Sequence, residues 1–137
     1  MNSKSDTHHG RCLCGAIEFE AQGDPKWVAH CHCDSCRRHT ASAMATFVGF
    51  PAKRFQFTKG TPKVIESSPE RWRSFCGDCG SPLTYHANWD PGGMHVYLGV
   101  LDEPEKFPAW IHVHCAERIC WFDTDDDLKR YPQMSGA

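Results

Sequence analysis

The sequence predicts an all-β domain built from short antiparallel sheets with little helix. In residues 16–22 the apolar side chains Ile17, Phe19 and Ala21 alternate with polar ones, which is the period-two pattern of a half-buried strand. Turn signals then separate short apolar segments at spacings of about ten residues, as is typical of all-β domains. No segment carries an apolar helical stripe of several turns.

The first predicted strand, residues 16–22, ends at the turn Gly23-Asp24-Pro25. A second strand over residues 27–30 leads into a group of cysteines. After it, residues 34–40 predict one short helical turn, with Asp34 or Ser35 as its N-cap.

Residues 43–50 predict a buried strand that Pro51 stops. The remaining predicted strands are all short and separated by turn residues: 54–58, 63–66, 71–75, 83–85, 95–100 and 110–114.

A length of 137 residues is that of one domain, and a composition of 40% hydrophobic and 23% charged residues suits a compact core. We therefore expect a single domain over residues 10–132, preceded by a flexible polar leader at 1–9 and followed by a short tail at 133–137.

The charge balance excludes some classes of partner. Fifteen Lys and Arg against seventeen Asp and Glu give a net charge of -2, which argues against a nucleic-acid surface. The longest apolar stretch, residues 43–50, contains Thr46 and Gly49, so we expect no membrane span. The first ten residues lack the apolar region of a secretory signal, which predicts a cytoplasmic protein. The oligomeric state is not readable from these features.

The nine cysteines are the most informative feature of the composition. An odd number does not suit a pure disulfide framework, and in a reducing compartment clustered cysteines usually hold metal. Seven of the nine fall in three tight groups, at residues 12–14, 31–36 and 76–79.

Two of these groups predict a structural zinc site. Cys12 and Cys14 must lie on a bend to share one ion, and Gly15 supplies the backbone freedom for it. Cys76 and Cys79 have the spacing of a knuckle turn, in which backbone N–H groups point at the sulfurs. Four thiolates close a tetrahedral shell, so the role of this site is stability.

Cys31, Cys33 and Cys36 offer three further thiolates within six residues. Three protein ligands are the usual number for a catalytic zinc, because the fourth position stays free for water or substrate. Two alternatives stay open: a fourth side chain closes the site, or the three cysteines hold no metal. The candidate fourth ligands are Cys115, His39 and His114.

Arg37 and Arg38 directly follow the three cysteines. A guanidinium suits bidentate contact with a carboxylate, so the pair is a candidate for binding the carboxylates of an acidic thiol substrate. The alternative is a solvated pair that lowers the thiol pKa or bridges to nearby acidic residues.

Three segments resemble one known family, the glutathione-dependent formaldehyde-activating enzymes, which include centromere protein V-like members. They are residues 10–19 (GRCLCGAIEF), 30–38 (HCHCDSCRR) and 75–83 (FCGDCGSPL). Residues 99–102 and 120–122 resemble its C-terminal half. The resemblance covers about residues 9–132 and implies an Mss4-like all-β zinc fold.

In that family Cys12, Cys14, Cys76 and Cys79 would hold a structural zinc, and Cys31, Cys33 and Cys36 a catalytic one. The implied activity is a carbon–sulfur lyase that joins glutathione and formaldehyde as S-(hydroxymethyl)glutathione. The chain is shorter than the enzymes for which that activity is named, so the thiol is glutathione or a similar small molecule, and the aldehyde is formaldehyde or a relative.

In this mechanism the substrate thiolate attacks the aldehyde, and a cationic or acidic group stabilises the developing charge on oxygen. Candidates are His32, His39, Arg37 and Arg38. The competing hypothesis is a zinc-stabilised binding domain without lyase activity.

Other residues favour structural roles. We expect the five tryptophans to serve core and edge packing, and residues 123–127 to form a solvated acidic turn, because they lack calcium-loop spacing. Cys115 and Cys120 are expected as buried free thiols. Four late histidines could approach the three-cysteine site: His86, His95, His112 and His114.

Overall fold

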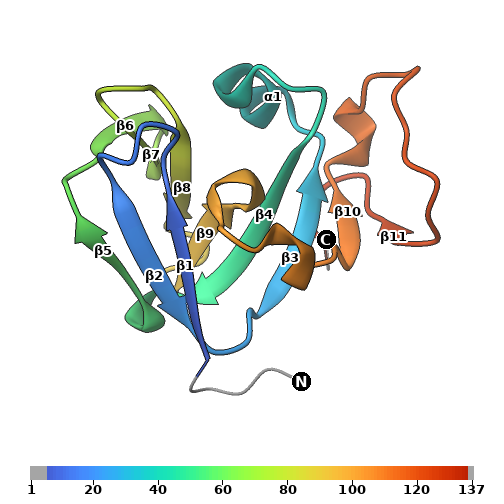
Figure 1. Ribbon diagram of the computed structural model, residues 1–137. Helices are drawn as coiled ribbons and strands as arrows, with labels where there is room; N and C mark the ends of the chain where they lie inside the picture. The colour runs from blue at the N-terminus through green and yellow to red at the C-terminus, as the bar shows by residue number, and fades with distance from the viewer. Residues whose placement is uncertain (1–5, 136–137) are drawn as a thin grey trace.

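The computed structural model describes residues 6–135 and contains two β-sheets (Figure 1). The smaller sheet has the order β1-β2-β5, and all of its pairs are antiparallel. Its strands are β1 (Thr7–Arg11), β2 (Glu18–Gln22) and β5 (Phe55–Lys59).

The larger sheet has the order β11-β10-β3-β4-β9-β8-β7-β6. Its pairs are antiparallel except β3 with β10 and β10 with β11, which are parallel. Its strands are β3 (Trp27–Cys31), β4 (Ala45–Pro51), β6 (Lys63–Ser68), β7 (Arg71–Phe75), β8 (Pro82–Ala87), β9 (Gly93–Tyr97), β10 (Ile111–Val113) and β11 (Lys129–Arg130).

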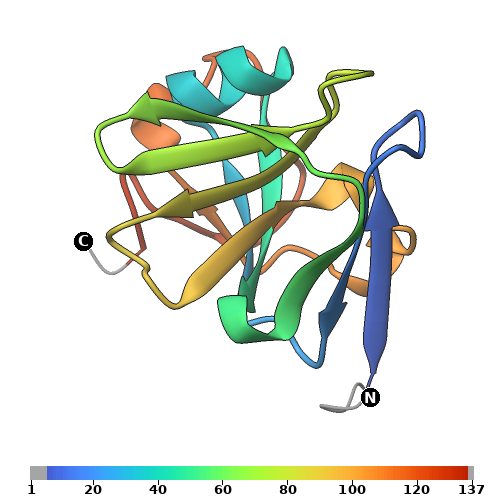
Figure 2. The ribbon, with the colours of Figure 1, turned by 90° about the vertical axis from the view of Figure 1, so that its left-hand side faces the viewer.

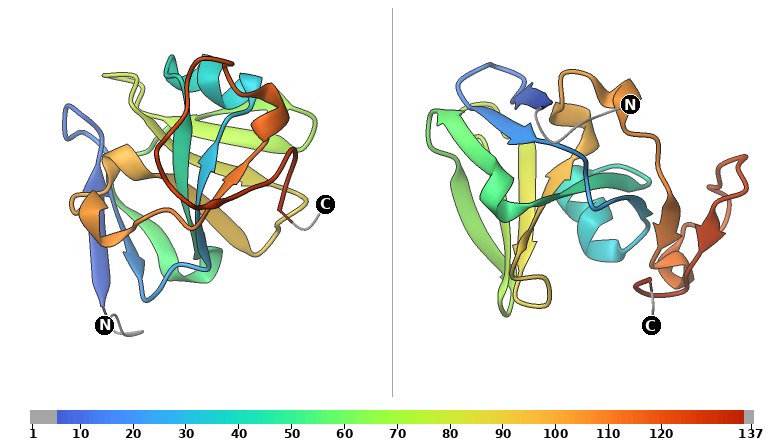
Figure 3. Two further views of the ribbon diagram at one scale, coloured as in Figure 1. Left: turned by 90° about the vertical axis from the view of Figure 1, so that its right-hand side faces the viewer. Right: turned by 90° about the horizontal axis from the view of Figure 1, so that it is seen from below.

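One α-helix, α1 (Asp34–Thr40), follows β3 and lies at one end of the larger sheet, above the β6–β7 hairpin in Figure 2. The short 3-10 turns are η1 (Ala52–Arg54), η2 (Leu98–Val100), η3 (Pro104–Lys106) and η4 (Cys115–Glu117). The segment after β10 folds back beside that strand before it forms β11 (Figure 3). Within residues 6–135 no helix is long and apolar enough to cross a membrane.

The main core lies between the two sheets. Phe19 of β2 is buried against Val48 and Phe50 of β4, together with Leu83 and Val96 from the next strands of the larger sheet. Because side chains alternate along a strand, Phe47 of β4 points the other way. It joins a second buried cluster with Cys31, Cys36, Ala45 and Tyr97. β4 is therefore covered on both faces, and the second cluster contains the candidate site.

The all-β prediction is confirmed, and most predicted strands lie within a residue or two of those observed. Residues 95–100 differ, because the strand ends at Tyr97 and continues as a 3-10 turn. The expectation of purely antiparallel sheets misses the parallel β10, whose pairing with β3 joins segments about eighty residues apart in sequence.

Two local expectations need correction. Residues 7–9, expected in a flexible leader, belong to β1, because His8 is buried and its ring bonds the Gly23 carbonyl at 3.0 Å. Residues 1–5 of that leader and residues 136–137 of the expected tail lie outside the described part of the chain. The N-cap of α1 is Cys33 rather than Asp34 or Ser35, since its sulfur accepts a hydrogen bond from the Cys36 N–H.

Gly49 of β4 lies directly opposite Trp27 of β3, and a Cβ atom there would lie 2.4 Å from the indole ring. We expect Gly49→Ala to displace Trp27 and lower the free energy of unfolding by about 1–3 kcal/mol, because overpacking forces neighbours from their rotamers. Gly92→Ala is the control, since nothing lies within 4 Å of its Cβ position. Equal denaturant stability of the two variants would contradict the packing described for β3 and β4.

Candidate metal centres

The four-cysteine group joins the two sheets. Cys12 and Cys14 follow β1 of the smaller sheet, whereas Cys76 and Cys79 follow β7 of the larger one. Their sulfurs all lie within 4.8 Å of one another, with Cys12 to Cys14 at 3.7 Å and Cys14 to Cys76 at 3.8 Å. Two sulfurs bound tetrahedrally at a Zn–S distance of about 2.3 Å are about 3.8 Å apart. The sulfur separations therefore fit one zinc ion.

Backbone N–H groups point at these sulfurs, as the knuckle spacing predicted. The N–H groups of Asp78 and Cys79 each donate to the Cys76 sulfur at 3.4 Å, and that of Ile17 donates to the Cys12 sulfur at 3.3 Å. The Ser81 hydroxyl hydrogen-bonds to the sulfur of Cys79 and lowers the pKa of that thiol to about 5. These donors stabilise thiolates, the form that binds metal.

The three-cysteine group forms where β3 ends and α1 begins. Cys31 is the last residue of β3, Cys33 caps α1, and Cys36 lies in its first turn. The sulfurs of Cys31 and Cys36 are 3.7 Å apart, which again fits two ligands of one zinc. All three sulfurs lie within 4.8 Å of one another, and no fourth His, Cys, Asp or Glu within residues 6–135 completes the group.

The three thiols are electrostatically coupled. Hydrogen bonds with Cys31 and Cys36 hold the pKa of the Cys33 thiol well below its usual range, whereas hydrogen bonds with Cys33 and Cys36 raise the pKa of Cys31. The contacts among the three sulfurs therefore favour the thiolate of Cys33 over that of Cys31.

A buried arginine lies beside this group. Arg73 of β7 is 4% exposed, and its guanidinium donates to the Cys36 sulfur at 3.5 Å and to the Tyr97 hydroxyl at 3.0 Å. Its Nε donates to the Ser67 hydroxyl at 3.0 Å, and its charge lies 4.8 Å from the centre of the Tyr85 ring. A buried cation in contact with a thiol favours the thiolate form.

Sequence reasoning missed Arg73 because it belongs to no cysteine motif and is 37 residues from Cys36. The sequence does predict the strand Arg71–Phe75, and alternation along it puts Arg73 and Phe75 on one face. That this face is directed toward the three cysteines becomes clear only when β7 is placed in the sheet.

A cavity of about 190 Å³ adjoins the three cysteines. Its wall is mainly aromatic and aliphatic. The basic side chains in the lining are those of Arg73, His95 and His114. The lining comprises Trp27, Ala29, Cys31, Cys33, Cys36, Phe47, Arg73, Tyr85, Trp89, His95, Ile111, Val113, His114, Met134 and Ser135. Two tryptophans expected to serve packing, Trp27 and Trp89, thus line a cavity.

Arg37 and Arg38 do not line this cavity. Arg38 pairs with the Asp34 carboxylate at 3.0 Å, and Arg37 bonds the backbone oxygens of His32 and Glu117. Arg38 is exposed and Arg37 partly buried, and both pair with Asp34, as in the alternative of a bridge to a nearby acidic residue.

The other candidate ligands and acid–base groups are distributed differently. His114 lines the cavity, whereas His32 and His39 do not. Cys115 is half-buried, and Cys120 is exposed rather than buried as expected, because the turn at residues 120–121 lies on the surface. Neither belongs to a cysteine group.

Comparison with known proteins agrees with this arrangement. The family model for the glutathione-dependent formaldehyde-activating enzyme matches residues 7–117. The match includes both cysteine groups and most of the two sheets, and the chain belongs to this family.

An uncharacterized lyase of Schizosaccharomyces pombe is 30% identical over 78 residues, which are 57% of this chain and 56% of the relative. The chain thus spans about half the length of that curated relative. The crystal structure of a Rhodobacter sphaeroides protein superimposes with a TM-score of 0.59 at 21% identity, covering 69% of this chain and 87% of the other. This likeness supports the all-β fold.

Proposed function

We propose that this protein is a zinc-dependent carbon–sulfur lyase-type enzyme that condenses a small thiol, glutathione or a similar one, with formaldehyde or a related aldehyde. The observation that carries the proposal is the contrast between its two cysteine groups. One has four sulfurs, enough to complete a tetrahedral shell, while the other has three and faces a cavity.

In this proposal Cys12, Cys14, Cys76 and Cys79 hold a structural zinc, and Cys31, Cys33 and Cys36 hold a catalytic one. Three thiolates and one dication carry a net charge of -1. The Arg73 guanidinium neutralises that charge inside the protein, where an uncompensated charge is costly. The nine unpaired cysteines are compatible with a reducing compartment such as the cytoplasm.

The reaction forms one S–C bond. The thiol loses its proton, and its sulfur attacks the carbonyl carbon. The C=O π electrons move to the oxygen, which takes a proton to give a hemithioacetal, the S-hydroxymethyl compound in the case of formaldehyde. Zinc, when bound, lowers the pKa of the substrate thiol. His114 lines the cavity and is our candidate to accept the thiol proton and return one to the aldehyde oxygen.

The cavity wall excludes water and stabilises negative charge. Trp27, Phe47 and Tyr85 limit the water around the reacting atoms, which strengthens electrostatic interactions inside the cavity. Arg73 is the cation nearest the sulfurs within the cavity lining, and it stabilises negative charge there. Contact of Arg37 and Arg38 with substrate carboxylates remains a prediction, and the position of these side chains outside the lining gives it no support.

The direct test of this function is a rate measurement on zinc-loaded protein. We expect the protein to form the hemithioacetal of formaldehyde with glutathione or a smaller thiol faster than the spontaneous reaction does. Cys33→Ser should lower the catalysed rate at least about tenfold, because it removes a ligand. Cys120→Ser, which alters an exposed cysteine outside both groups, should keep the full rate. A wild-type rate equal to the spontaneous one with each thiol removes the proposal.

Metal content tests the structural site separately. We expect Cys76→Ser to lower the zinc content by one ion per chain and to destabilise the fold, since Cys76 is 1% exposed and joins the two sheets. Zinc per chain is measured by mass spectrometry, with Cys120→Ser as the matched control. Unchanged zinc content in Cys76→Ser would show that the four cysteines do not share an ion.

The contribution of Arg73 is measurable as a shift in the pH at which the protein releases half of its zinc. Protons compete with zinc for thiolates, so the metal is released as pH falls. Removing the guanidinium destabilises the thiolates, and we expect Arg73→Gln to move the midpoint of zinc release upward by about one pH unit. Arg73→Lys, which keeps the charge, should restore part of the shift. A midpoint identical in all three proteins would contradict the charge-compensating role.

A further inference from the structure

A third group of candidate metal ligands contains no cysteine and belongs to none of the predicted sites. One ring nitrogen each of His30 and His112 and one carboxylate oxygen of Asp126 all lie within 4.8 Å of one another. His30 and His112 are paired residues on the parallel strands β3 and β10, so their side chains share one face. The cavity-lining residues Ala29, Cys31, Ile111 and Val113 alternate with them. The group therefore lies on the opposite face of these strands from the proposed active site.

The contact between His112 and Asp126 is long for a hydrogen bond. His112 Nε2 lies 3.2 Å from Oδ2 and 3.3 Å from Oδ1 of Asp126, whereas His95 Nε2 lies 2.8 Å from Asp90 Oδ2 in the same protein. Hydrogen bonds to ionised carboxylates are typically about 2.7–2.9 Å. Two ligands of one tetrahedral zinc, with bonds near 2.0–2.1 Å, are about 3.3 Å apart. The His112–Asp126 separation matches the second geometry.

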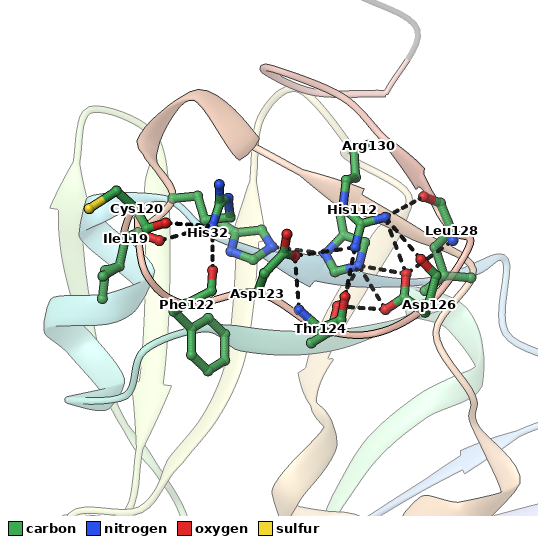
Figure 4. Close-up of polar contacts among 11 residues, drawn as sticks. His32, His112, Ile119, Cys120, Phe122, Asp123, Thr124, Asp126, Leu128 and Arg130 are labelled. Carbon is green, nitrogen blue, oxygen red and sulfur yellow. Dashed lines mark hydrogen bonds and ion pairs between the residues drawn. The ribbon is translucent and has the colours of Figure 1, made fainter.

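The other nitrogen of each histidine already has a partner, as is usual for metal ligands. His30 Nδ1 is 2.7 Å from the Thr46 hydroxyl, which leaves Nε2 to bind an ion. His112 Nδ1 is 2.8 Å from His32 Nε2, which leaves Nε2 directed at Asp126 (Figure 4). These contacts fix both imidazole rings.

The carboxylate of Asp126 is fixed as well. Its Oδ1 accepts a hydrogen bond from the Leu128 N–H at 3.0 Å and lies 3.3 Å from Arg130 Nη1. The Thr124 hydroxyl donates to Oδ2 and holds the pKa of Asp126 well below its usual range, so the group is an anion at neutral pH. The turn at 123–127, expected to be merely solvated, thus directs one oxygen of Asp126 toward two buried or half-buried imidazoles.

We propose that His30, His112 and Asp126 form an additional binding site for a late first-row divalent metal ion, with Zn²⁺ as the fitting member. Two imidazoles and one carboxylate suit zinc and its neighbours, whereas calcium and magnesium require more oxygen ligands. The proposal does not rest on the lyase activity proposed above.

The site would also connect to the three-cysteine loop. His32 lies between Cys31 and Cys33 in sequence, is fully buried, and contacts His112. If the metal-free His112 carries its proton on Nε2, that N–H faces Asp126 and the Thr124 hydroxyl, and His112 Nδ1 accepts from His32 Nε2–H. A metal on His112 Nε2 would require the His112 proton on Nδ1 and the His32 proton on its own Nδ1, which has no hydrogen-bond partner within the described residues. Binding would then reverse the tautomers of both rings without changing the number of protons.

The stoichiometric test is equilibrium dialysis of the folded protein against free Zn²⁺. We expect Asp126→Asn to bind one ion per chain fewer than wild type while keeping its cysteine-bound zinc. Asp90→Asn is the matched control, because it changes a His–Asp pair that lacks a second histidine, and it should bind as many ions as wild type. Equal stoichiometry in Asp126→Asn and wild type overturns the proposal.

A spectroscopic test needs no variant. Long-range ¹H–¹⁵N spectra distinguish Nδ1–H from Nε2–H tautomers of each histidine. When Zn²⁺ is added to protein whose cysteine groups are already loaded, we expect His112 and His32 to change tautomer and the Nε2 resonance of His30 to shift. Unchanged ring nitrogens in all three histidines would contradict the site, whatever the activity of the protein.

Discussion

The close approach of sulfurs from distant parts of the chain is the constraint on which the rest of the structure depends. Cys14 and Cys76 are 62 residues apart in sequence, yet their sulfurs lie 3.8 Å apart where the smaller sheet meets the larger one. Thiolates at this distance repel one another unless a cation lies between them, so the geometry and a bound metal support each other. The core between the sheets, with Phe19 and Phe50 fully buried, packs beside this junction.

The three-cysteine group offers the same kind of ligands in a more open arrangement. It forms where a strand ends and a helix begins, so three sulfurs converge over only six residues and no fourth ligand within residues 6–135 joins them. An aromatic cavity adjoins the three sulfurs, and the buried guanidinium of Arg73 from β7 contacts the Cys36 sulfur, where it offsets negative charge on the thiolates. The four-sulfur group suits stability, and the three-sulfur group suits reactivity.

Local features could be predicted from the sequence. Cysteine spacing predicted both cysteine groups, and alternation of apolar side chains predicted β2. Gly15 has the positive φ of 82° that the bend beside Cys12 and Cys14 required. Long-range pairing decided the rest. Arg73 contacts Cys36 from β7, a strand that β4, β9 and β8 separate from β3 in the larger sheet. His112 meets His30 only because β10 pairs in parallel with β3. Neither relation leaves a motif in the sequence, which is why Arg37 and Arg38, adjacent to the cysteines, were the stronger candidates.

The decisive measurement is anomalous diffraction at the zinc absorption edge, from crystals of the whole chain grown without chelator. We expect one peak enclosed by Cys12, Cys14, Cys76 and Cys79, and a second bound by Cys31, Cys33 and Cys36 with water or thiol in the remaining position. A second group without a peak, or one completed by a fourth side chain, would contradict a reactive metal centre and leave a zinc-braced scaffold.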